Sequence, residues 1–91
     1  MSRNSNLEAA INRDLNRLSS EYYSIVDLAR EYNAPVLAMV DRQDLRYIKN
    51  KLSDLLIQIE SLPEDDYKKR VRQEVATISE SVSHSLLRHS V

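Results

Sequence analysis

The sequence lacks cysteine, glycine, tryptophan and phenylalanine, and the absence of cysteine and of glycine excludes several classes of protein. Without cysteine there is no disulfide scaffold, no thiolate metal site and no cysteine nucleophile. Without glycine there is no loop of the kind that cradles phosphate, because such loops need residues without a Cβ. No apolar stretch approaches the roughly 18 residues of a membrane span. We therefore expect no cofactor and no membrane partner.

An excess of charge of one sign is also missing. The 91 residues include 13 basic and 14 acidic side chains, with a net charge of −1, and each third of the chain is close to balanced. Such a chain is not steered as a whole toward DNA or anionic lipid. The first residues, in which no apolar core follows Arg3, do not resemble a secretory signal. We expect a single cytoplasmic domain over residues 1–91.

Proline is scarce, and its two occurrences divide the chain into three segments of similar length. Proline inside a helix costs about 3 kcal/mol, so Pro35 and Pro63 mark helix boundaries. The predicted helices cover about 5–33, 36–61 and 62–88. We predict an all-α fold, a three-helix up-down-up bundle with coiled-coil-like heptad packing. The alternative is a helical hairpin that is completed by dimerisation.

Apolar residues recur at steps of three and four in all three segments, which is typical of a heptad seam. The first seam is Ile11, Leu15, Leu18, Tyr22, Ile25, Ala29 and Tyr32. The second seam is Leu45, Ile48, Leu52, Leu55, Ile59 and Leu62. The third seam is Tyr67, Val71, Val75, Ile78, Val82 and Leu86. These side chains are the predicted core.

Capping residues predict where the helices begin. Ser5 with Glu8, and Ser61 with Glu64, have the spacing of capping boxes, in which the hydroxyl and the carboxylate satisfy each other's backbone N–H groups. Asp41 is a candidate N-cap for the regular part of the second helix.

Two stretches have a less regular pattern. The apolar run 36–40 has no amphipathic spacing, so it is either the start of the second helix or an extended buried connector, and we favour helix. Serine occupies every second position from Ser79 to Ser85. Because serine is a mediocre helix former, we expect the third helix to fray after residue 79.

The sequence contains no constellation typical of catalysis or of a metal site. The two histidines, His84 and His89, are five residues apart and do not share a helix face. The acidic run 64–66 and the pair Asp41 and Asp44 are explained as negative charge at helix N-termini. We therefore expect no enzyme, no catalytic or metal-binding residue and no small-molecule substrate.

Basic residues predict one alternative function. Four of five consecutive positions in 68–72 are basic, and the bundle would place them beside two arginines of the first helix. Such a corner would bind phosphate and make the protein a nucleic-acid-binding accessory factor. The residues of this hypothesis are Arg13, Arg17, Lys68, Lys69, Arg70 and Arg72.

Apolar residues outside the seams favour protein binding. They are concentrated around the turn between the first two helices, and the least needed by a single seam are Tyr23, Leu37, Met39 and Tyr47. A thick cap on the bundle with scattered exposed side chains would also explain them. We expect a protein partner or self-association, and a non-catalytic protein-binding module: a small accessory, adaptor or chaperone-like subunit. A small inhibitor that acts by steric occlusion is a further alternative.

Overall fold

The computed structural model of the protein describes residues 5–88, with side chains from Asn6 to Leu87. The predicted all-α three-helix bundle is confirmed, and the described part of the chain has no strand. The elements in chain order are α1 (Ser5–Glu31), the short 3₁₀ helix η1 (Val36–Ala38), α2 (Arg42–Glu60) and α3 (Asp66–Arg88).

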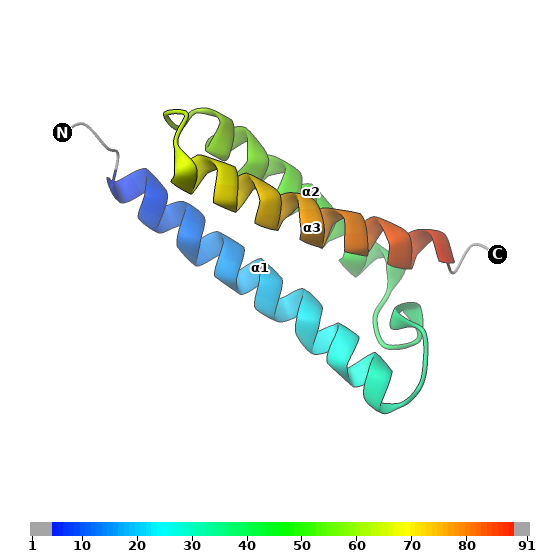
Figure 1. Ribbon diagram of the computed structural model, residues 1–91. Coiled ribbons are helices and arrows are strands. Elements are labelled where there is room, and N and C mark those ends of the chain that lie inside the picture. Colours follow the sequence, from blue (N-terminus) through cyan, green and yellow to red (C-terminus); the bar gives the residue numbers. More distant parts are fainter. Residues whose placement is uncertain (1–4, 89–91) are drawn as a thin grey trace.

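The bundle is elongated, with extents of 49 × 22 × 20 Å. Figure 1 shows α2 and α3 lying side by side and antiparallel, whereas α1 diverges from them toward its C-terminal end. The connection that contains η1 contacts both α1 and α3. The bundle is therefore closed at one end by the α2–α3 turn and at the other by the α1–α2 connection.

The predicted seams form the core. All six seam residues of the second segment are buried, from Leu45 to Leu62. In α1 and α3 the middle of each seam is buried, whereas Ile25, Tyr67 and Leu86 are only partly buried. The seam prediction is wrong for Tyr32, which is 67% exposed. Tyr32 follows the last residue of α1, at the point where the chain turns away toward η1.

The C-terminus of α1 is capped by the backbone. Asn33 has a φ of 52°, in the left-handed region that asparagine tolerates better than most residues. The N–H of Asn33 donates to the carbonyl of Arg30 at 3.0 Å, and the N–H of Ala34 donates to that of Ala29 at 2.8 Å. These two bonds form a Schellman motif, built without glycine. At the other end of α1, the side chain of Ser5, on which the first capping box depends, lies outside the described side chains.

The second helix does not begin at residue 36 as predicted, because residues 36–38 form the separate 3₁₀ helix η1 and α2 begins at Arg42. Val36, Leu37 and Val40 pack against the core from the connection. They cover the end of the bundle between α1 and α3, which an extension of α2 along its own axis could not do. Asp41 occupies the predicted N-cap position, but its side chain makes no capping hydrogen bond.

The second predicted capping box is also wrong. The Ser61 hydroxyl donates to the carbonyl of Gln58 at 2.7 Å, at the end of α2. The start of α3 is instead capped by Asp65, whose Oδ1 accepts the Lys68 N–H at 3.0 Å. The carboxylate of Glu64 is engaged by the Lys68 ammonium. Helix α3 therefore begins at Asp66, four residues later than predicted.

Helices α2 and α3 each cap the C-terminus of the other with a cation. The Arg42 guanidinium, in the first turn of α2, donates to the carbonyl of Leu86 at 3.3 Å. The Lys68 ammonium, in the first turn of α3, donates to the carbonyls of Glu60 and Leu62 at 3.1 and 3.0 Å. A cation is favourable at a helix C-terminus, where carbonyls lack intrahelical partners. This exchange strengthens the antiparallel pair at both of its ends.

A buried tyrosine of α1 forms hydrogen bonds with the serine-rich part of α3. Tyr22 is 1% exposed, and its hydroxyl lies 2.7 Å from Ser81 Oγ and 3.1 Å from Ser85 Oγ. Two serines at a spacing of four residues share one helix face, so both reach the same phenol. Helix α3 continues to Arg88, and its fraying after residue 79 stays a prediction.

Candidate functional site

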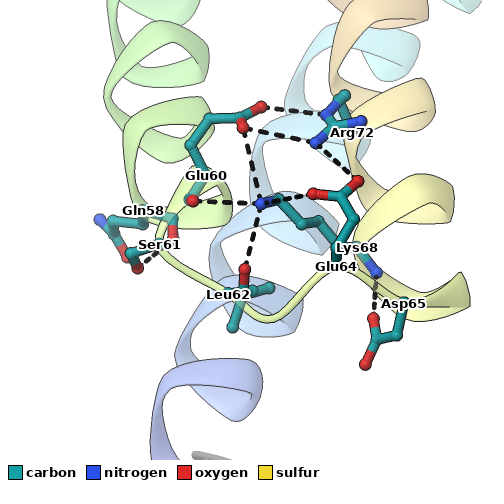
Figure 2. Close-up of polar contacts among 8 residues, drawn as sticks. All are labelled: Gln58, Glu60, Ser61, Leu62, Glu64, Asp65, Lys68 and Arg72. Carbon is teal, nitrogen blue, oxygen red and sulfur yellow. Dashed lines mark hydrogen bonds and ion pairs between the residues drawn. The ribbon is translucent and has the colours of Figure 1, made fainter.

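The basic corner predicted from the sequence contains a buried lysine. Lys68 is only 5% exposed, and Figure 2 shows its ammonium among groups of the α2–α3 turn. Besides the two carbonyls at the end of α2, Nζ lies 3.1 Å from Glu64 Oε1 and 3.7 Å from Glu60 Oε1. A charge taken out of water needs such partners. Lys68 is therefore a structural cation and is not available to phosphate.

Arg72 binds the same two carboxylates from their outer side (Figure 2). Its Nε lies 3.0 Å from Glu60 Oε2, and its Nη2 lies 3.4 Å from Glu64 Oε2. The hydrogen bond from Lys68, assisted by the charges of Lys68 and Arg72, lowers the pKa of Glu64 below its usual range. The hydrogen bond to Glu60 raises the pKa of Arg72. Two carboxylates thus neutralise two of the predicted phosphate ligands.

The other four predicted phosphate ligands do not contact the cluster of Lys68, Arg72 and the two carboxylates. Arg13 and Arg17 both lie close to the carboxylate of Asp14, at 3.7 and 3.8 Å. The guanidinium of Arg70 stands over the ring of Tyr67, 5.3 Å from its centroid, and Lys69 is exposed beside it. Arg17 lines the groove between α1 and α2, whereas Lys68 and Arg72 face the end of α2. The structure therefore does not assemble the six cations into one site.

The seam pattern contained a signal for the burial of Lys68. Counting back from Val71 by three residues gives Lys68, and counting back by four gives the expected core residue Tyr67. The regular alternation through Val71, Val75 and Ile78 favours the step of three. Tyr67 is instead half-buried against α1, where its hydroxyl donates to Asn12 Oδ1 at 2.7 Å. The position of Lys68 on the seam therefore indicated that this charged side chain is buried and has a structural role.

The four predicted protein-binding residues do not form one surface. Tyr23 lies in a groove between α1 and α3, whereas Tyr47 lies in the groove between α1 and α2. Leu37 packs against the core, and Met39 is half-buried in the connection. Tyr23 and Tyr47, which we expected together around the turn between the first two helices, flank α1 on different sides.

The groove between α1 and α2 has a volume of about 310 Å³. Its floor is apolar and buried, formed by Leu18 and Leu55, and Tyr47 is 57% exposed at its side. The Lys51 ammonium lies 5.5 Å from the centroid of the Tyr47 ring. The complete lining is Asp14, Arg17, Leu18, Glu21, Tyr47, Lys51, Asp54, Leu55 and Gln58.

The other exposed apolar side chains are dispersed over the described surface. Leu28 and Tyr32 lie at the C-terminal end of α1, Ile57 on α2 and Leu87 near the end of α3. His84 is exposed on α3, and His89 lies outside the described residues. Within residues 5–88, no three metal-ligating side chains come together, and none of the helices is long and apolar enough to cross a bilayer.

No protein-family model, curated protein or solved structure matches this chain.

Proposed function

We propose that the protein is a non-catalytic protein-binding module, a small accessory, adaptor or chaperone-like subunit, which docks on a larger protein through the groove between α1 and α2. The observation that carries the proposal is Tyr47, more than half exposed beside a groove whose floor is Leu18 and Leu55. A partner that covers this groove removes the exposed aromatic ring of Tyr47 from water.

Tyrosine suits such a role for a physical reason. Its ring supplies a large apolar area, and its hydroxyl keeps a polar contact at the rim. Aromatic side chains of this kind dominate the binding energy at many interfaces, whereas most neighbouring contacts contribute little. A small inhibitor that acts by steric occlusion would use the same groove, so it is a special case of this proposal.

No observation favours nucleic acid as the partner. Lys68 and Arg72 are engaged by Glu60 and Glu64. A chain that binds phosphate through Lys69 and Arg70 would be retained on heparin, and its retention would fall steeply with salt. Such retention, lost on replacement of Lys69 and Arg70 with glutamine, would support the nucleic-acid alternative.

The proposal is tested by affinity capture from the native cells with wild-type, Tyr47→Ala and Tyr32→Ala chains. Tyr47→Ala should keep the helical circular dichroism signal and weaken binding by about thirtyfold, equivalent to about 2 kcal/mol. Tyr32→Ala, which removes an exposed ring away from the groove, should bind like wild type. Light scattering on the purified chain identifies the case in which the partner is a second copy.

Tyr23→Ala locates the interface if Tyr47 is not part of it. Loss of capture with Tyr23→Ala, but not with Tyr47→Ala, would move the interface to the groove between α1 and α3. Unchanged capture with both variants would contradict a tyrosine-centred interface.

A further inference from the structure

The grooves between the three helix pairs differ in charge. The groove between α1 and α3 has one charged lining residue, Glu74, and the groove between α2 and α3 also has one, Glu80. The groove between α1 and α2 has five, namely Asp14, Arg17, Glu21, Lys51 and Asp54. Of these three grooves, as the described residues line them, the last carries the most charges that a partner could match.

Three of the five charged side chains, Glu21, Lys51 and Asp54, form no ion pair among the described residues. Arg17 Nη2 lies 3.8 Å from Asp14 Oδ1, and Lys51 stands over the ring of Tyr47. Glu21 comes from α1 and Asp54 from α2, so each wall of the groove carries one carboxylate that forms no ion pair, and the α2 wall also carries Lys51.

We propose that the groove docks a segment of a partner protein that presents an arginine or lysine between Glu21 and Asp54, with an apolar neighbour against Tyr47. This inference rests on the proposed function and adds the chemistry of the partner. A cation placed between two carboxylates is attracted electrostatically by both, and this attraction becomes stronger when the docked segment excludes water. The apolar neighbour packs against the exposed ring of Tyr47, and the buried side chains of Leu18 and Leu55 at the floor supply no charge.

The test selects a phage-displayed library of random 12-residue peptides on the folded chain. Selected peptides should combine a basic residue with an apolar residue three or four positions away, the spacing at which both reach one face of a helix. Substitution of the basic residue by citrulline, which keeps the shape of arginine without its charge, should weaken binding by about tenfold or more, and added salt should act in the same direction.

Two double variants of equal charge locate the effect. Glu21→Gln with Asp54→Asn should lose at least about tenfold in peptide affinity. Glu31→Gln with Glu74→Gln changes the net charge by the same amount outside the groove and should bind like wild type. All four side chains are exposed, so both variants should fold.

The outcomes separate this inference from the proposed function. Basic peptides that are lost with the first variant and kept with the second support the inference. Peptides that depend on Tyr47 but not on Glu21 and Asp54, or that carry no basic residue, overturn the inference and leave the proposed function standing. A failure to select any peptide that depends on Tyr47 contradicts both.

Discussion

The two ends of the bundle are closed by different chemistry. The end with the α2–α3 turn is held by a buried ammonium, Lys68, which binds two carbonyls and two carboxylates. The end with the α1–α2 connection is covered by apolar side chains of the connection, Val36, Leu37 and Val40. Hydrogen bonds to a charge require specific atoms at specific distances, whereas apolar packing requires area and shape. We therefore expect the turn end to be sensitive to the identity of one residue and the connection end to tolerate substitution.

A substitution in the core between the two ends should have the largest effect on stability. Leu52 is fully buried, and Leu52→Ala should lower the free energy of unfolding by roughly 2–5 kcal/mol, measured by urea denaturation. Asp54→Ala, at an exposed position of the same helix, should change it by less than about 0.5 kcal/mol. Similar losses from the two variants would show that this seam is not the centre of the core.

The turn end is broken by Lys68→Ala. The carbonyls of Glu60 and Leu62 then lose a buried donor, and we expect a loss of roughly 1–3 kcal/mol in unfolding free energy. The matched control is Lys69→Ala, which removes an exposed lysine at the next position. If both variants are equally stable, Lys68 does not hold the turn.

The hydroxyl of Tyr22 tests how α1 is joined to the C-terminal half of α3. Tyr22→Phe keeps the buried ring and removes the contacts to Ser81 and Ser85, so it should cost about 0.5–1.5 kcal/mol. Hydrogen exchange should become faster at residues 81–86 and stay unchanged in α2 near Leu52. Equal acceleration in both regions would mean that the hydroxyl contributes only to global stability.

Acid should weaken the turn end selectively, with the smallest effect of the series. Because the hydrogen bond from Lys68 lowers the pKa of Glu64, ionised Glu64 stabilises the fold above the unfolded-state pKa of about 4.3. This contribution is lost as the pH falls through the lower pKa of the folded state. Glu64→Gln should therefore be less stable than wild type at neutral pH, and the difference should shrink in acid. A difference that does not change with pH would contradict this role.

Much of the fold could be predicted because heptad spacing and proline positions are local properties. Leu45, Leu52 and Ile59 repeat along one helix face, so their burial follows from the period alone. The same period predicts that Tyr23 and Tyr47 are exposed, because both lie off the seams, and both are exposed.

The candidate site could be predicted only in part. Tyr47 was expected to be accessible, and it is. Its separation from Tyr23 was not expected. The pattern of the first two helices alone places the two tyrosines near each other, but in the bundle Tyr23 lies in the groove between α1 and α3 and Tyr47 in the groove between α1 and α2. Glu21 and Asp54 were not predicted as a pair, since no local spacing connects one helix with another.

The sequence by itself determined the helices, their cores and their faces, because each depends on residues within one or two turns. Only the tertiary structure decided what the charged residues do. Lys68 and Lys69 are identical neighbours, yet one is buried in the α2–α3 turn and the other is exposed. The difference arises because Lys68 lies on the seam that faces the C-terminus of α2, where carbonyls and the carboxylates of Glu60 and Glu64 converge. A charge interacts with whatever the folded chain brings within a few ångströms, and that neighbourhood does not exist before the helices pack.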